Sequence, residues 1–162
     1  MYQKIFEQGK IGNVTFKNRL VMSPMGTSLA EMDGSPSEDM IAFYEARAVG
    51  GAGLIIPEIA RVNDVHGAGM MRQLSVSKDR HIEGLAKLAA VVHKHGTKIF
   101  IQLHHPGRET VTALTGGPVV SASANLDKRV TNSALVICSF GAKIVSDFPS
   151  IMPCSYTVLT YV

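Results

Sequence analysis

The sequence has few residues of the kinds that build metal clusters and disulfide frameworks. Its 162 residues include two cysteines, Cys138 and Cys154, and no C-x-x-C pair. Structural zinc sites and iron–sulfur clusters need several cysteine or histidine ligands at close spacing. The sequence therefore encodes neither a zinc knuckle nor an iron–sulfur cluster, and we interpret both cysteines as free thiols.

Tryptophan is absent, and no segment is rich in lysine and arginine. The net charge of +3 comes from 16 basic and 13 acidic residues that are interspersed along the chain, and the four tyrosines and six phenylalanines do not alternate with basic residues. A nucleic-acid groove combines a basic stripe with aromatic side chains. We therefore expect no nucleic-acid partner.

Long apolar segments are missing as well. No window approaches the roughly 18 apolar residues of a membrane span, and the N-terminus lacks the apolar core of a signal peptide. These absences predict a cytoplasmic protein without a membrane partner. The content of 46% hydrophobic and 18% charged residues is typical of one globular domain.

Two segments have the pattern of amphipathic helices. The first is expected to begin with Ser35 as its cap, Pro36 in its first turn and Glu38 completing a capping box, and to run to about Val49. The second spans residues 79–95, where apolar side chains recur at helical spacing until a glycine ends the pattern.

Short apolar runs alternate with these helices and predict strands at residues 20–22, 53–56 and 98–103. Residues 10–17 predict a preceding hairpin that turns at Gly12 and Asn13. The order strand, helix, strand, helix, strand indicates an α/β fold with a parallel sheet and right-handed connections. No G-x-G-x-x-G motif joins a strand to a helix, which disfavours a Rossmann-type fold.

Polar and flexible residues follow the carboxyl ends of these strands, the edge at which ligands bind in barrels and open α/β sheets. Residues 23–26 follow the first strand, and a long loop at residues 59–78 follows the second. Gln102 lies near the C-terminal end of the third strand. A glutamine amide carries donors and an acceptor on one flat edge. Gln102 is therefore suited to pair with the donor–acceptor edge of a heterocycle such as a flavin.

His104, His105 and Arg108 are expected where the third strand opens into a loop. Taken one by one, a glutamine in a strand and two adjacent histidines are more typical of structural positions than of a ligand site. A metal site formed by His104, His105 and Glu109 is a further alternative, although contiguous histidines in such a turn rarely converge on one ion. The flavin interpretation is the leading one because the rest of the chain favours it.

Three motifs, in this order, resemble the old yellow enzyme-like NADH:flavin oxidoreductases, particularly the bacterial 2-enoate, bile-acid-precursor and 2,4-dienoyl-CoA reductases. They are KNRLVMSPM at residues 17–25, FY at 43–44 with RAVGGAGLI at 47–55, and QLHHPGR at 102–108. The resemblance covers residues from about 4 to 124. It divides the chain into a partial flavin-binding barrel at 1–124 and a divergent tail at 125–162.

The resemblance implies the N-terminal portion of a TIM (β/α)8 barrel, about three βα units preceded by the hairpin, with FMN held at the C-terminal mouth. The cofactor-binding residues that it implies are Ser23, Pro24, Met25, Gly26, Ile59 and Gln102. Relatives often carry threonine or cysteine at the position of Gly26, where the hydroxyl or thiol tunes the flavin. In this chain that contact is missing or is replaced by Thr27.

The implied activity is that of an FMN-dependent oxidoreductase. NAD(P)H reduces FMN, and the reduced flavin gives a hydride to an activated C=C bond of a small enoate, enone or dienoyl-CoA. In relatives an H-G-A-H-G-Y-L-like motif supplies the donors for the substrate carbonyl and the proton-donating tyrosine. No such motif follows Ala124, so no catalytic residue is assigned. Relatives of this branch often add an iron–sulfur cluster and a further dinucleotide domain downstream.

A complete barrel needs about 250 residues, so we expect a truncated chain. The alternative function is a catalytically inactive fragment or interaction module without bound flavin. Three barrel strands would leave an unpaired parallel edge and uncovered apolar faces, which predicts a poorly soluble protein. The flavin affinity is also expected to be lower than in a complete barrel, because the phosphate clamp and several ring contacts are absent, so the chain is expected to be colourless as purified. Within the tail, residues 134–140 and 156–162 have strand-like composition.

Overall fold

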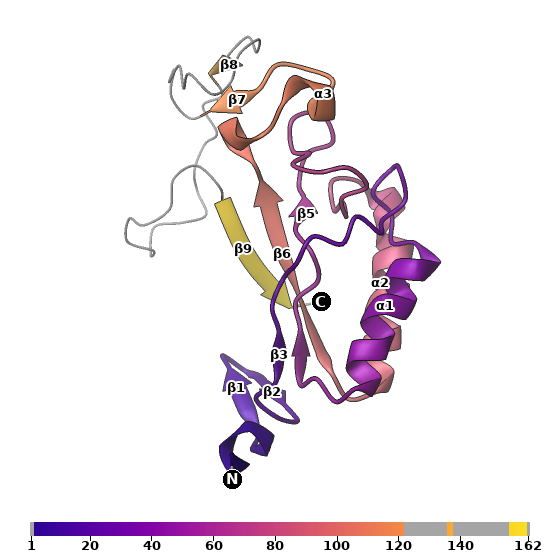
Figure 1. Ribbon diagram of the computed structural model, residues 1–162, viewed down its shortest axis with the longest axis vertical. Helices are drawn as coiled ribbons and strands as arrows, with labels where there is room; N and C mark the ends of the chain where they lie inside the picture. The colour runs from indigo at the N-terminus through magenta and orange to yellow at the C-terminus, as the bar shows by residue number, and fades with distance from the viewer. Residues whose placement is uncertain (1, 122–135, 138–155, 162) are drawn as a thin grey trace.

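The structure, a computed structural model, describes residues 2–121, 136–137 and 156–161. In this part of the chain a parallel sheet is covered on one face by two helices, and a small hairpin lies at the lower end of the view (Figure 1). The α/β fold class predicted from the sequence is confirmed. No helix in the described ranges is long and apolar enough to cross a membrane.

The hairpin follows a 3-10 turn, η1 (Gln3–Phe6), and joins β1 (Gly9–Ile11) to β2 (Val14–Phe16) in antiparallel pairing. Its turn contains Gly12, whose φ of 55° lies in the left-handed region that favours glycine. The hairpin therefore forms where the sequence predicts it.

Parallel strands form the sheet in the order β3 (Val21–Met22), β4 (Leu54–Ile55), β6 (Lys98–His105) and β5 (Ala60–Arg61). Both β4 and β5 pair with β6. They are therefore two halves of one strand that is interrupted near Pro57, where proline offers no N–H for the ladder.

This interruption contains one extra residue. The offset between paired residues is 44 for Ile55 and Ile99 (99 − 55) and 43 for Ala60 and Leu103 (103 − 60). The β4–β5 strand thus holds one more residue than the facing stretch of β6, which is the definition of a β-bulge. Bulges re-aim side chains and occur often beside functional sites.

Two helices pack on one face of the sheet. Helix α1 (Glu38–Val49) lies between β3 and β4, and α2 (Ile82–Lys94), preceded by the 3-10 turn η2 (Asp79–His81), lies between β5 and β6. Their buried side chains and those of the sheet form the main core, which includes Met40, Tyr44, Leu88, Val92, Ile55, Ile99 and Ile101.

The start of α1 differs from the sequence prediction. Ser37 is the N-cap, because its hydroxyl accepts a hydrogen bond from Met40 N at 3.0 Å and donates one to the carbonyl of Leu29. Ser35 instead contacts the Asp33 carboxylate through its N–H at 2.8 Å and its hydroxyl at 3.0 Å. The predicted cap at Ser35 is wrong because Asp33 engages that residue in a local turn.

A smaller core lies on the other face of the sheet, where the hairpin covers its lower end. It contains Phe16, Leu54, Ile56 and Phe100, and the rings of Phe16 and Phe100 meet edge to face with centroids 6.1 Å apart. Side chains alternate between the two faces along a strand. Gln102 therefore lies on the same face of β6 as Phe100.

The remaining described elements are η3 (Gly107–Glu109), α3 (Thr112–Thr115), β7 (Val120–Ser121), β8 (Val136–Ile137) and β9 (Tyr156–Tyr161). Strand β8 pairs with β7, and β9 pairs antiparallel with β6 from Phe100 to His105. The sequence predicts an unpaired parallel edge without placing it at a particular strand, and β9 supplies backbone partners along one side of β6. In the described part of the chain, the open edge of the sheet is β3.

Candidate functional site

The three segments predicted to bind a ligand meet at one end of the sheet. Strands β3, β4 and β6 are parallel and in register, with Met22 opposite Ile55 and Ile55 opposite Ile99. Residues 23–26 continue directly from β3, Ile59 directly precedes β5, and Gln102 lies in the carboxyl half of β6. The fold thus brings the sequence-predicted residues to the same end of the sheet, the end at which the parallel strands have their carboxyl termini. These residues are Ser23, Pro24, Met25, Gly26, Ile59 and Gln102.

The exposure of these residues suits a flat ligand. Ser23 and Gly26 are exposed, and 57% of the Met25 side chain remains accessible, whereas Gln102 is half-buried on β6. The segment that follows β3 is therefore accessible to a ligand, and the side-chain amide of Gln102 is held in the neighbouring part of the sheet by β6. A flavin needs this combination, because its ring stacks on main chain while its pyrimidine edge needs donors and an acceptor. The residues present fit the cofactor that the resemblance implies.

Glu58, in the bulge between β4 and β5, is a buried carboxylate that holds the segments at this end of the sheet by hydrogen bonds. Its Oε2 accepts hydrogen bonds from the N–H and the hydroxyl of Thr27, both at 2.6 Å, and from Ser28 N at 3.2 Å. Glu58 has no exposed surface, so these donors replace its solvation shell. The carboxylate thus fixes the end of the segment that begins at Ser23.

The same residue reaches two further segments. Oε1 of Glu58 accepts a hydrogen bond from Leu74 N at 2.9 Å, and Glu58 N donates to the hydroxyl of Tyr44 in α1 at 2.8 Å. Burial raises the pKa of Tyr44 to about 12, so its hydroxyl stays neutral. Glu58 is not among the residues predicted from the sequence, although a carboxylate that follows an apolar strand and a proline is a usable signal.

The predicted loop at residues 59–78 begins with β5, so its first part is a strand, and the irregular segment that follows β5 is held by a second carboxylate, Asp64. It accepts hydrogen bonds from Arg61 Nε at 3.2 Å, Ser75 Oγ at 3.2 Å and Ser77 Oγ at 2.5 Å, and it pairs with Arg80 at 3.1 Å. Burial acts to raise the pKa of Asp64, but the hydrogen bonds from Ser77, Ser75 and Arg61 lower it to about 2. This network gives the loop a defined path.

His104 and His105 lie within β6, so their predicted position in a loop is wrong. The backbone of His104 pairs with Arg61 of β5, and both histidines pair with β9, which extends the strand through them. Burial lowers the pKa of both imidazoles, and the neighbouring imidazoles add to this effect. Nδ1 of His104 is buried without a hydrogen-bond partner among the described residues.

The metal-site alternative does not fit this arrangement. Within the described residues, no group of three histidine, cysteine, aspartate or glutamate side chains is placed to hold a metal ion. Glu109 lies in η3, where it is exposed and pairs with Arg108 at 3.4 Å. The three residues proposed as ligands therefore form no ligand set.

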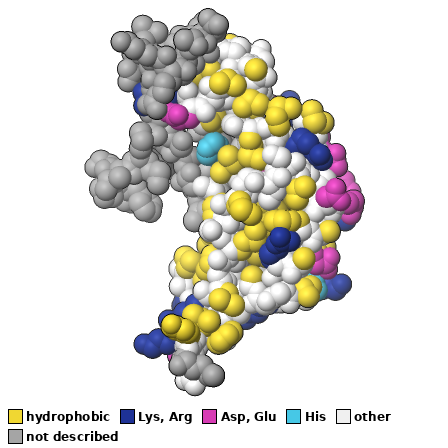
Figure 2. Space-filling view, viewed as in Figure 1, with side chains coloured by type: hydrophobic (Ala, Val, Ile, Leu, Met, Phe, Trp, Pro, Cys, Tyr) yellow, Lys and Arg dark blue, Asp and Glu magenta, His cyan; other side chains and the backbone are white. Residues whose placement is uncertain are grey.

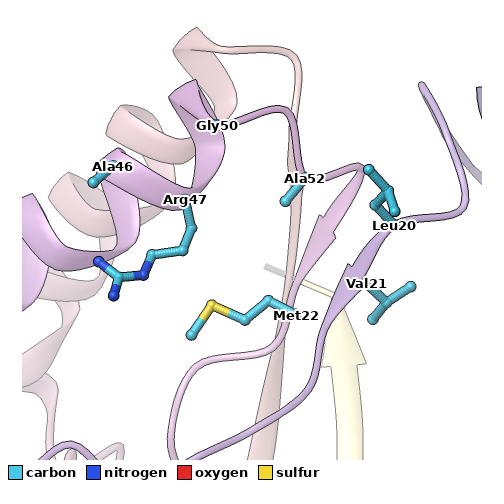
Figure 3. A pocket seen from close by; sticks show the side chains of 7 residues that line it. All are labelled: Leu20, Val21, Met22, Ala46, Arg47, Gly50 and Ala52. Carbon is cyan, nitrogen blue, oxygen red and sulfur yellow. The ribbon is translucent and has the colours of Figure 1, made fainter.

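A groove lies beside β3, the open edge of the sheet, between this strand and the last turns of α1 (Figure 3). It has a volume of about 460 Å³ and is lined by Leu20, Val21, Met22, Ala46, Arg47, Gly50 and Ala52. Arg47 extends beside it, with its guanidinium 3.4 Å from the centroid of the Phe43 ring and its Nη1 donating to the Phe43 carbonyl at 2.9 Å. The groove thus belongs to the sheet edge and not to the candidate site.

Comparison with known proteins supports the same assignment. The model of the NADH:flavin oxidoreductase / NADH oxidase family matches residues 4–140, so the similarity extends beyond Ala124, its predicted end. The chain is 45% identical to the NADH oxidase of Thermoanaerobacter brockii over 116 residues, which are 72% of this chain and 18% of that protein. It is 44% identical to the NADPH dehydrogenase of Bacillus subtilis over 110 residues, 67% of this chain and 32% of that protein.

Solved structures agree with this match. The old yellow enzyme homologue of Zymomonas mobilis superposes with a TM-score of 0.70 at 33% identity, over 75% of this chain and 34% of that chain. The chain thus spans less than half the length of the relatives that it matches. The predicted partial barrel and the predicted resemblance are confirmed. The chain belongs to the NADH:flavin oxidoreductase / NADH oxidase family.

Proposed function

We propose that this chain is the flavin-binding N-terminal part of an NAD(P)H-dependent oxidoreductase that reduces activated C=C bonds of small enoates, enones or dienoyl-CoA thioesters. Family membership implies FMN as the cofactor and NAD(P)H as its reductant. The observation that carries the proposal is that residues 23–26, Ile59 and Gln102 meet at the carboxyl end of the parallel sheet.

In this proposal each segment has a separate role in holding the cofactor. The half-buried amide of Gln102 pairs with the pyrimidine edge of the flavin, because it offers donors and an acceptor in one plane. The main chain of residues 23–26 and of Ile59 lines the ring. When bound, FMN supplies the hydride-transfer chemistry. Glu58 keeps Thr27 and Ser28 fixed, so the neighbouring main chain is in position before the cofactor arrives.

The test of this proposal is FMN binding followed by reduction. The purified 162-residue chain is titrated with FMN while flavin fluorescence is recorded, and NADH or NADPH is then added without oxygen. We expect saturable binding and bleaching of the flavin absorbance. Gln102→Leu should weaken FMN binding roughly tenfold because it removes the paired amide, whereas Gln8→Leu, at an exposed position before the hairpin, should not. Lack of saturable binding by the wild-type chain contradicts the proposal.

One observation favours the alternative, a non-catalytic fragment or interaction module. Strand β9 pairs antiparallel with β6, at the edge where a parallel barrel places its next parallel strand. If this pairing persists in solution, the barrel does not continue from β6. The reduction experiment separates the two functions, because a non-catalytic module leaves the flavin absorbance unchanged after NADH or NADPH is added.

A further inference from the structure

The side chain of Met70 fills the space beside Gly26, at the tip of β3. A Cβ atom added to Gly26 would lie 3.0 Å from the Met70 sulfur and 3.2 Å from the Met70 terminal methyl. The thioether of Met70 therefore occupies the place into which a side chain at position 26 would project. Gly26 itself is exposed, so this thioether lies at the border of the candidate site.

Thr27, the other candidate for a side-chain contact here, is engaged elsewhere. Its hydroxyl donates its proton to Glu58 Oε2 at 2.6 Å and accepts a hydrogen bond from Leu29 N at 3.3 Å. A hydroxyl has one proton to donate. Thr27 therefore has no donor left for a ligand on the outer side of the loop.

Met70 is presented by a turn that is anchored at both ends. The side-chain oxygen of Gln73, a residue without exposed surface, accepts a hydrogen bond from Gly69 N at 2.8 Å. Arg72 adopts a left-handed φ of 48° and donates from Nε to the Ala30 carbonyl at 2.7 Å. Leu74 N, just after the turn, donates to Glu58. The position of Met70 is thus fixed by contacts that do not involve its own side chain.

We propose that Met70 is a flavin-contacting residue whose thioether packs against the aromatic ring beside Gly26. The inference rests on the proposed function, because it requires FMN at this edge. Sulfur–aromatic contacts are favourable, and a thioether has no proton to donate. The chain therefore places an apolar, polarisable group beside the flavin at a position that a hydrogen-bonding side chain at residue 26 would otherwise reach.

The test uses the full chain labelled with ¹³C at the methionine methyl groups and titrated with FMN. Variants that replace single methionines by leucine assign the signals. Met25 reports occupation of the proposed site, Met70 reports the inference, and Met71, 58% exposed and adjacent in the same turn, is the control. We expect the Met25 and Met70 signals to shift with one saturation curve and the Met71 signal to stay in place.

The outcomes separate the inference from the proposed function. A shift of Met25 without a shift of Met70 overturns the inference and leaves the proposed function standing. If neither signal shifts, both are overturned. Equal shifts of Met70 and Met71 indicate non-specific association and also overturn the inference.

Two variants add a second readout. Met70→Leu should weaken FMN binding about two- to tenfold because it removes the sulfur contact, while Met71→Leu should leave the affinity unchanged. Gly26→Thr forces the Met70 thioether to move, so the FMN-dependent shift of the Met70 signal should shrink while that of Met25 persists. Unchanged affinity in Met70→Leu, with an unchanged Met70 shift in Gly26→Thr, overturns the inference.

Discussion

At the scale of single residues, the carboxylate of Glu58 holds the segments that form the candidate site in place by hydrogen bonds. It is fully buried and accepts four hydrogen bonds, three at Oε2 and one at Oε1. A buried carboxylate without such donors would be strongly destabilising. The bulge that interrupts the β4–β5 strand places it where donors from residues 27, 28 and 74 converge.

Replacing Glu58 by glutamine should therefore be costly. The amide can accept with only one oxygen and brings an NH₂ group against backbone N–H groups, so Glu58→Gln should lower the free energy of unfolding by about 1–3 kcal/mol. Urea denaturation measures this change, with Glu83→Gln at an exposed position of α2 as the control. An equal effect of both substitutions would show that the hydrogen bonds at Glu58 contribute nothing specific.

Because the pKa of Asp64 is lowered in the folded chain, we expect the free energy of unfolding to depend on pH. Its pKa falls from 3.8 to about 2 in the folded chain, and its side chain is 17% exposed. Because the folded pKa is depressed, the stabilisation is fully present above the unfolded value and is lost as the pH falls through the folded value. The contribution is about 2 kcal/mol at neutral pH.

Asp64→Asn should remove this contribution. Urea unfolding at a series of pH values should give a difference between wild type and variant that is constant from pH 7 to about pH 4 and shrinks toward pH 2. A difference that stays the same across this acid range would contradict the assignment to Asp64.

At the scale of secondary structure, the start of α1 provides a direct comparison of two serines. Ser37→Ala removes the cap to Met40 N and the bond to Leu29, and should lower the free energy of unfolding by about 1 kcal/mol. Ser35→Ala removes only a local contact with Asp33, which is exposed, and should cost less. Thermal or urea unfolding of both variants checks the order, and a larger loss in Ser35→Ala would favour the cap position predicted from the sequence.

At the same scale, the sequence predicts the helices and strands well because apolar periodicity follows which face is buried. It misses where β6 ends, since His104 and His105 are extended by backbone pairing with β5 and β9 and not by their own side chains. It also misses the bulge, because one extra residue between two paired strands leaves no periodic signal in either of them.

At the scale of the whole molecule, the open edge of the described sheet exposes apolar side chains. In the space-filling view, acidic side chains gather along the side of the molecule where the helices lie, whereas lysine and arginine side chains are scattered (Figure 2). At β3, the open edge of the described sheet, Val21 is 50% exposed, and Leu20, which directly precedes the strand, is 38% exposed. Unpaired apolar edge strands promote association between chains.

We therefore expect the chain to self-associate through β3. Val21→Lys places a charge on this edge and should increase the soluble, monomeric fraction in sedimentation velocity experiments. Val111→Lys, at a similarly exposed valine (51%) before α3, adds the same charge away from the edge and is the control. Equal gains from both substitutions would attribute the effect to net charge alone.

The sequence by itself determines the hairpin, the alternation of strands and helices, and the residue types at the strand ends, because these depend on local periodicity and on motifs. The tertiary structure alone decides that Glu58 joins three segments, that Met70 fills the space beside Gly26, and that β9 pairs with β6. These contacts link residues far apart in the chain. Their formation depends on how packed elements position backbone donors in space, which no local pattern of residues records.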